Sequence, residues 1–202
     1  LGGWFDAATL GVYGIALNLA TVAEVAGSRL FAAVAMPAFS EKVRMDRSGL
    51  PSVYFRMRLP FDLMFLLCAG ALFSLGPVLV QGLYDSRYAQ AGTMLQWLSF
   101  TLVFARYGMT GSAYLALGEP RLLTWIHVVK AVSIFVLTPV LYSMFGLTGA
   151  LIAIAFHAAP TLPVMYWFNR QLGLNDLRFE LKVLPAWPLG YALGEMARWL
   201  LA

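Results

Sequence analysis

AGTMLQWLSFTLVFARYGMTGSAYLAL, residues 91–117, is a long apolar run whose single charge is Arg106. As a helix the run would be about 40 Å long, enough to cross a hydrocarbon core of about 30 Å. Arg106 would then lie well inside the lipid, where an arginine costs about 2.5 to 3.5 kcal/mol on insertion scales. We therefore expect the guanidinium to face other protein, an anionic partner or a watery cavity.

The two faces of this predicted helix differ in polarity, as expected if Arg106 faces away from lipid. Small and polar residues share the side of Arg106, and large apolar residues lie opposite. The first set is Ser99, Thr110 and Ala113, and the second set is Trp97, Phe104 and Leu115. One face suits lipid and the other suits a polar environment.

The composition indicates an integral membrane protein. Of the 202 residues, 60% are hydrophobic and 12% are charged, whereas a soluble domain has about 25% charged residues. The mean hydropathy is +0.73. A pI near 9.4 does not indicate a nucleic-acid partner, because basic cytoplasmic connectors give a membrane protein the same value. The single cysteine, Cys68, lies in an apolar run and is expected to be a packing residue.

Apolar runs and their Pro and Gly breaks predict an all-α, polytopic transmembrane bundle of about six spans. The predicted spans are residues 9–36, 60–83, 91–117, 122–144, 147–168 and 184–202. Residues 1–170 would hold the first five transmembrane helices, and residues 171–202 a cytoplasmic connector and an additional span. We expect Pro37 to end the first span and residues 38–59 to form a basic loop outside the lipid. In the last span, Gly190 and Gly194 form a GxxxG pair, and Glu195 can pair with Arg198.

The charges of the predicted connectors set the orientation. The connectors after the first, third and fifth spans carry nine basic residues, whereas the others carry only Arg87. The nine are Lys42, Arg44, Arg47, Arg56, Arg58, Arg121, Arg170, Arg178 and Lys182. The positive-inside rule places them in the cytoplasm, so the chain would begin outside it. It starts at Leu1 with no signal segment, and we expect an N-terminal part with at least one helix to be missing.

Further candidate site residues are ionisable side chains inside the predicted spans. Glu24 is either the structural partner of a buried cation or a proton-titrating or substrate-facing group. Arg29 and Lys130 either extend to the membrane interface or line a cavity. His157 is either a packed, hydrogen-bonded group or one that couples protons or contacts substrate. His127, one turn before Lys130, is either an interfacial or hydrogen-bonded histidine or a functional group.

Motifs of catalysis are missing from the sequence. It contains no GxxxxGK loop, no HExxH, no clustered cysteines and no GxSxG. The connectors are short and carry no paired carboxylates suited to acid/base or metal chemistry. We therefore expect no enzyme, no cofactor and no metal, and favour a pathway through the membrane.

Several short motifs, in their order and spacing, resemble a known family. They are Asp6-Ala-Ala-Thr-Leu-Gly-Val-Tyr13, Met36-Pro-Ala-Phe-Ser40, Gly76-Pro77 leading to Leu83-Tyr-Asp-Ser-Arg-Tyr-Ala-Gln-Ala-Gly92, Tyr114-Leu-Ala-Leu-Gly118 and Phe145-Gly-Leu-Thr-Gly-Ala150. The chain thereby resembles the polysaccharide-exporter branch of the multidrug/oligosaccharidyl-lipid/polysaccharide superfamily, which includes O-antigen and exopolysaccharide flippases.

The resemblance implies a fold and a substrate. Members have two related six-helix lobes around a central cavity and work by alternating access. This chain would be the second lobe from its second helix onward plus a thirteenth helix, with the first lobe missing. The substrate would be an undecaprenyl-diphosphate-linked oligosaccharide, moved across the bacterial cytoplasmic membrane for surface polysaccharide such as the O-antigen of lipopolysaccharide. The other partners would be the lipid bilayer and a coupling ion, H⁺ or Na⁺.

Site residues follow from the same resemblance. Arg106, and after it Lys130 and Arg29, would hold the diphosphate and sugars in the cavity. Glu24 and His157 are the candidates for ion coupling. Two alternatives stay open: a multidrug exporter of the same superfamily, and a fragment of a membrane enzyme that acts on lipid-linked sugars. A structural membrane scaffold would leave Arg106 unexplained.

Overall fold

The structure, a computed structural model, describes residues 6–201, which are helical along most of their length and contain no strand. Three helical segments are long and apolar enough to cross a membrane: Ala7–Met45, Arg47–Leu83 and Pro120–Leu172. The predicted all-α class is confirmed for these residues, and the count of about six spans stays a prediction.

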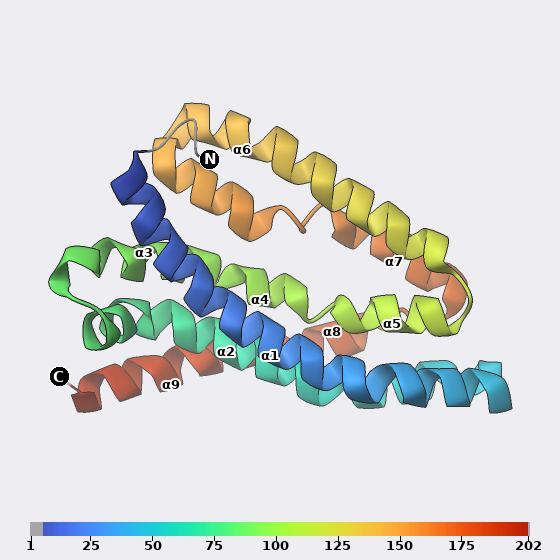
Figure 1. Cartoon of the computed structure of the whole chain (residues 1–202). Helices are drawn as coiled ribbons and strands as arrows, with labels where there is room; N and C mark the ends of the chain where they lie inside the picture. The colour runs from blue at the N-terminus through green and yellow to red at the C-terminus, as the bar shows by residue number, and fades with distance from the viewer. Residues whose placement is uncertain (1–5, 202) are drawn as a thin grey trace.

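The chain forms layers of long helices (Figure 1). The elements are α1 (Ala7–Met45), η1 (Arg47–Gly49), α2 (Leu50–Leu83), η2 (Ser86–Tyr88), α3 (Ala89–Leu98), α4 (Phe100–Ala105), α5 (Gly108–Ala116), α6 (Pro120–Phe156), α7 (Thr161–Leu172), α8 (Leu177–Val183) and α9 (Ala186–Leu201). The helix α2 packs against α1, α9 and the α3–α5 run, and α6 lies on the far side of that run.

The predicted basic loop over residues 38–59 is wrong, because α1 and α2 fill most of it. Pro37 lies inside α1. A helix can tolerate an internal proline, because the proline removes one hydrogen bond and does not always end the helix. The turn begins at Asp46, which is extended (φ −159°) and accepts a hydrogen bond from the Ser48 N–H at 3.0 Å. Arg58, expected in this loop, is 1% exposed inside α2.

The run over residues 91–117 is three helices in place of one. The breaks fall at Ser99 and at Arg106–Tyr107. The Ser99 hydroxyl donates to the Gln96 carbonyl at 2.7 Å, a bond that competes with regular helix geometry. At the second break the Tyr107 N–H donates to the Phe104 carbonyl at 3.1 Å, which is the tighter i→i+3 pattern. Arg106 therefore lies at a junction between α4 and α5.

The helix α6 reverses direction at the predicted Phe145–Gly146 turn. Gly146 has φ 59° and ψ −138°, a conformation that side chains with a Cβ rarely adopt. The two arms of α6 run antiparallel in Figure 1. The predicted span over residues 147–168 is interrupted between α6 and α7 at His157–Pro160, as its prolines indicated.

The contact between α2 and α9 is a backbone-to-backbone approach. A Cβ on Gly70 would lie 2.1 Å from the Trp187 carbonyl oxygen, and one on Gly190 would lie 2.2 Å from the Leu67 carbonyl oxygen. Such approaches are typical of membrane helices with small interface residues. The GxxxG prediction is confirmed as a packing motif, and Glu195 pairs with Arg198 at 3.3 Å.

Large apolar side chains of α6 point away from the protein. Phe135 is 79% exposed and Met144 is 65% exposed. An apolar surface of this kind marks a membrane or protein contact. This exposure agrees with the position of α6 in a segment that is long and apolar enough to cross a membrane.

Candidate functional site

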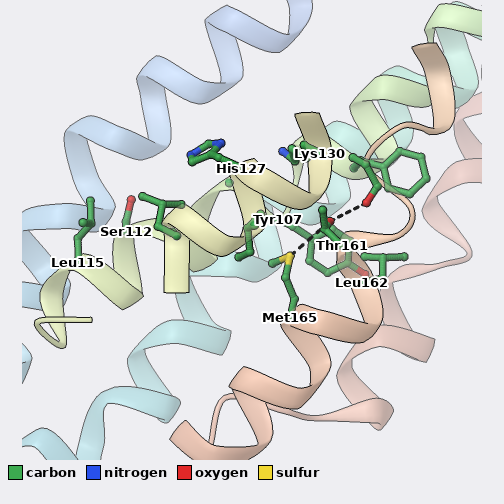
Figure 2. Close-up of a pocket in the computed structure, with 14 residues that line it drawn as sticks. Tyr107, Ser112, Leu115, His127, Lys130, Thr161, Leu162 and Met165 are labelled. Carbon is green, nitrogen blue, oxygen red and sulfur yellow. Dashed lines mark hydrogen bonds between the residues drawn. The ribbon is translucent and has the colours of Figure 1, made fainter. Parts of the chain in front are cut away.

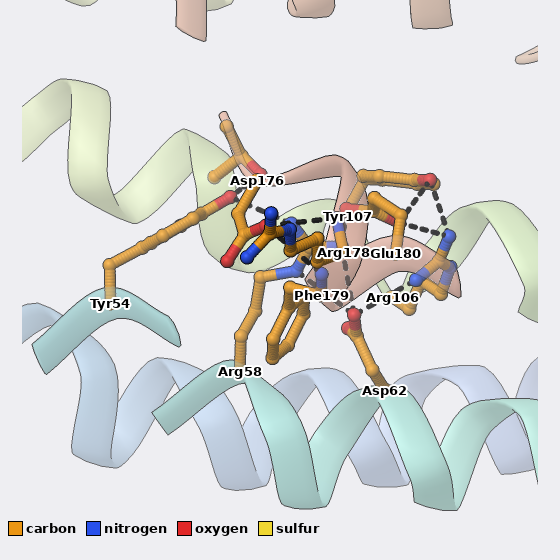
Figure 3. Close-up of polar contacts among 10 residues, drawn as sticks. Tyr54, Arg58, Asp62, Arg106, Tyr107, Asp176, Arg178, Phe179 and Glu180 are labelled. Atoms are coloured by element: carbon orange, nitrogen blue, oxygen red, sulfur yellow. Dashed lines mark hydrogen bonds and ion pairs between the residues drawn. The ribbon is translucent and has the colours of Figure 1, made fainter. Parts of the chain in front are cut away.

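Three buried charges and one half-buried charge meet where α2, the α4–α5 junction and α8 come together (Figure 3). Arg58 and Asp62 come from α2, Arg106 from the junction and Glu180 from α8. Asp62 Oδ2 lies 2.8 Å from Arg58 Nη2 and 2.9 Å from Arg106 Nη1. Glu180 lies 2.7 Å from each of the two guanidiniums, through Oε1 to Arg58 and Oε2 to Arg106. We call these four residues the charge network.

Hydroxyl groups complete the charge network. Arg58 Nη1 donates to the Tyr54 hydroxyl at 3.2 Å, and that hydroxyl is 2.7 Å from the hydroxyl of Thr110. The Tyr107 hydroxyl donates to Glu180 Oε2 at 3.0 Å and also contacts Arg106 Nη2. The guanidinium carbon of Arg58 lies 5.0 Å from the centre of the Tyr107 ring, within cation–π range.

The network is electrically balanced. Its two guanidiniums face two carboxylates, and Arg58, Asp62 and Arg106 are each less than 5% exposed. Burial would raise the pKa of Glu180, but the positive charges of Arg58 and Arg106 outweigh this and lower the pKa overall. Removing one member of such a network is costly, because its partner stays buried and charged.

Arg106 therefore faces other protein, one of the three environments expected for it. Its anions are Asp62, 44 residues away in the sequence, and Glu180, 74 residues away. Neither carboxylate was singled out from the sequence. Asp62 follows Arg58 by four residues in an apolar helix, a spacing that favours pairing, whereas Glu180 has no such local signal. A substrate-binding role for Arg106 stays a prediction.

Three other candidates come together on the opposite side of the α3–α5 run. Glu24 of α1 lies within electrostatic range of Lys130 of α6 and of His157, which follows α6. All three are half-buried. Among the described residues no direct ion pair joins them, and His157 Nδ1 lies 2.7 Å from the carbonyl oxygen of Ile154. We call Glu24, Lys130 and His157 the open cluster.

A cavity of about 240 Å³ adjoins the open cluster (Figure 2). Its wall comes from α4, α5, the first arm of α6 and the start of α7. The polar residues lining it are Tyr107, Ser112, His127, Lys130 and Thr161. The ammonium of Lys130 is thus the cation of a cavity that is otherwise largely apolar. An anion entering it would meet one positive charge and several hydroxyl groups.

Arg29 lies apart from both groups. It is exposed on α1, and the part of the chain that the structure describes offers it no ion pair. Its role in the cavity stays a prediction. The structure thus brings Glu24, Lys130 and His157 together and leaves Arg29 and Arg106 elsewhere.

Comparison with known proteins gives no assignment. No protein-family model, no curated protein and no solved structure matches the chain. Within residues 6–201 no three His, Cys, Asp or Glu residues are grouped to hold a metal ion. The function must therefore be argued from the charges, the cavity and the apolar helices.

Proposed function

We propose that the chain is part of a flippase for undecaprenyl-diphosphate-linked oligosaccharide in the bacterial cytoplasmic membrane. It would form the second lobe, with about six spans, and work by alternating access with a first lobe. The product would supply surface polysaccharide such as O-antigen. One observation carries the proposal: a half-buried cation, Lys130, lines a cavity between long apolar helices, with Glu24 and His157 close by.

The cavity chemistry suits a lipid-linked diphosphate. An ammonium without a direct carboxylate partner is free to pair with a phosphate oxygen, and the hydroxyl of Ser112 can donate a hydrogen bond to it. The apolar remainder of the wall suits the isoprenoid chain. In this proposal Lys130 is the main protein cation that binds the substrate diphosphate, and Arg29 contacts the substrate nearer the membrane surface.

Glu24 and His157 are the proposed coupling groups. Glu24 lies within electrostatic range of both Lys130, the cation proposed to hold the substrate, and His157. Protonation of Glu24 would remove the negative charge that competes with the diphosphate for Lys130. An H⁺ or Na⁺ gradient could thereby alter substrate affinity between the two sides of the membrane.

The test replaces Lys130 in the complete protein and measures surface polysaccharide. Lys130→Met should abolish export while the amount of protein in the membrane is unchanged, and Lys130→Arg should retain export because the charge remains. Lys182→Met is the matched control, since Lys182 is exposed on α8. Normal export by a stably expressed Lys130→Met protein would exclude the proposal.

The same strains separate the two alternatives. Unchanged polysaccharide with increased drug sensitivity would indicate a multidrug exporter. Polysaccharide of altered linkage or length would indicate an enzyme that acts on lipid-linked sugars. Both results would replace the flippase proposal.

A further inference from the structure

The carboxylate of Glu180 has the surroundings of a bound anion. Its two oxygens contact Arg58 Nη2 at 2.7 Å, Arg106 Nη2 at 2.7 Å and the Tyr107 hydroxyl at 3.0 Å. Two guanidiniums and a hydroxyl around one oxyanion are the donors that phosphate groups recruit in proteins. Here the oxyanion is supplied by the protein itself.

Glu180 does not use all the donors of this site. Arg106 Nε is buried without a hydrogen-bond partner, whereas Arg58 Nη2 already lies 2.7 Å from Glu180 and 2.8 Å from Asp62. Both side chains are more than nine-tenths buried. A carboxylate has two oxygens in a plane, whereas a phosphate group offers three or more around a tetrahedral centre. A larger oxyanion could therefore also engage Arg106 Nε, which Glu180 leaves without an acceptor.

Glu180 is also the one charge of the network that has a route out. Its side chain is 26% exposed, against 0% for Asp62 and 4% for Arg106. It lines a cavity of about 460 Å³ together with Tyr107, Asn169 and Asn175. The backbone of α8 can stay in place, held by buried Phe179 and Val183, while the Glu180 side chain rotates into this cavity.

Asp176 adds a second carboxylate to the wall of that cavity. Its Oδ1 accepts hydrogen bonds from the backbone N–H groups of Arg178 and Phe179 at 2.9 and 3.1 Å. These bonds and the helix N-terminus offset part of its negative charge. Asp176 therefore does not prevent an anion from approaching the guanidiniums.

Charge counting gives the consequence of such a movement. With Glu180 in place, Arg58 and Arg106 are balanced by two carboxylates. With Glu180 withdrawn, only Asp62 remains, and the pocket holds a net positive charge among buried donors. An unpaired buried charge is unfavourable, so the pocket would bind an anion or recover Glu180.

We propose that Arg58, Arg106 and Tyr107 form a binding site for a phosphate-class anion, and that Glu180 occupies this site as an internal ligand until the anion displaces it. The site shares Tyr107 with the wall of the cavity at Lys130, but its cations are Arg58 and Arg106. That the anion is the diphosphate of the lipid-linked substrate rests on the proposed function; that the site binds free inorganic phosphates does not.

The first experiment measures binding of inorganic pyrophosphate to the full-length protein in lipid nanodiscs. The readout is the rise in the unfolding temperature with pyrophosphate concentration. Glu180→Gln removes the competing charge and keeps the side-chain shape, so its affinity should exceed that of the wild type by about tenfold or more. Glu195→Gln is the matched control, because Glu195 pairs with Arg198 in α9, away from the site, and it should bind like the wild type. Equal affinities of Glu180→Gln and the wild type would overturn the proposal.

A second measurement uses the wild type and does not depend on the folding of a variant. Carbodiimide labels accessible carboxyl groups, and mass spectrometry locates the label. Saturating pyrophosphate should increase labelling of Glu180 and leave that of Glu195 unchanged. Labelling of Glu180 that stays constant would contradict displacement.

A third arm separates the site from the transport function. Nanodiscs with and without undecaprenyl diphosphate compare the lipid-linked anion with free pyrophosphate as the ligand. If free pyrophosphate binds, undecaprenyl diphosphate does not, and Lys130→Met leaves export unchanged, the anion site is supported and the flippase function is rejected. Export that depends on Lys130, with no binding of either anion at Glu180→Gln, would support the flippase and reject the site.

Discussion

The charge network and the open cluster differ in whether their charged side chains form direct ion pairs. In the network, two arginines and two carboxylates are joined by direct contacts of 2.7 to 2.9 Å. In the open cluster, Glu24, Lys130 and His157 influence one another without direct ion pairs among the described residues, and Lys130 borders a cavity. A network of direct ion pairs fixes helices in place, whereas charges without a direct partner beside a cavity are available to a ligand or a proton.

We expect the largest effect on the free energy of unfolding at Asp62. Asp62→Ala leaves Arg58 and Arg106 buried with a single carboxylate, and we expect the free energy of unfolding to fall by about 3 to 5 kcal/mol. Unfolding of the purified protein in mixed detergent measures it. Asp85→Ala, which breaks an exposed pair with Arg87, should lower the free energy of unfolding far less, because solvent screens an exposed pair. A loss at Asp62 as small as that at Asp85 would mean that the network carries no structural role.

A double variant sharpens this test. Arg58→Met with Asp62→Leu removes one charge of each sign and leaves Arg106 paired with Glu180. Apolar replacement of a buried pair is often neutral, so most of the stability lost in Asp62→Ala should return. The same unfolding assay applies. A double variant as unstable as Asp62→Ala would show that geometry, and not charge balance, decides stability here.

The next effect concerns the packing that positions Glu180. The helix α9 follows α8 closely and lies against α2, where a Cβ on Gly190 would be 2.2 Å from the Leu67 carbonyl oxygen. Gly190→Ala should therefore separate α9 from α2, at a cost of about 1 to 3 kcal/mol. Carbodiimide labelling of Glu180 should rise as well. Gly82→Ala, with no atom within 4 Å of the added carbon, serves as the control and should change neither quantity appreciably.

The open cluster should respond weakly in stability. Lys130→Met and Glu24→Gln each remove a half-buried charge that has no direct ion pair, so we expect changes of less than about 1 kcal/mol. Export should nevertheless fail in the first variant and lose its dependence on the ion gradient in the second. Unfolding and export measured on the same preparations check this. A destabilisation comparable to that of Asp62→Ala would remove the distinction between the two groups of charges.

The smallest effect is the acid response of Glu180. Its pKa in the folded protein is lowered, because the attraction of Arg58 and Arg106 exceeds the effect of burial. The stabilisation is therefore complete above the unfolded pKa of about 4.3 and is lost as the pH falls through the lower folded value. Unfolding temperatures between about pH 3 and pH 7 should show a steeper acid decline in the wild type than in Glu180→Gln. Identical slopes in the wild type and Glu180→Gln would contradict the assignment of this acid response to Glu180.

Local signals in the sequence predict local structure correctly. The reversal at Gly146, the break before α7 and the close approach at Gly190 follow from residue types at fixed positions. The loop predicted around Pro37 and Arg58 is wrong. A proline and a basic residue favour a loop, but packing between α1 and α2 outweighs the first, and the carboxylates of Asp62 and Glu180 accommodate the second.

The sequence by itself determined that this is an apolar helical chain with charges inside its long helices, because hydropathy and helix breaks act over neighbouring residues. Only the tertiary structure decided which charges neutralise one another. Arg106 reaches Asp62 across 44 residues and Glu180 across 74, and Lys130 meets Glu24 from another helix. Such pairings depend on how the helices pack, and spacing along one helix does not encode them.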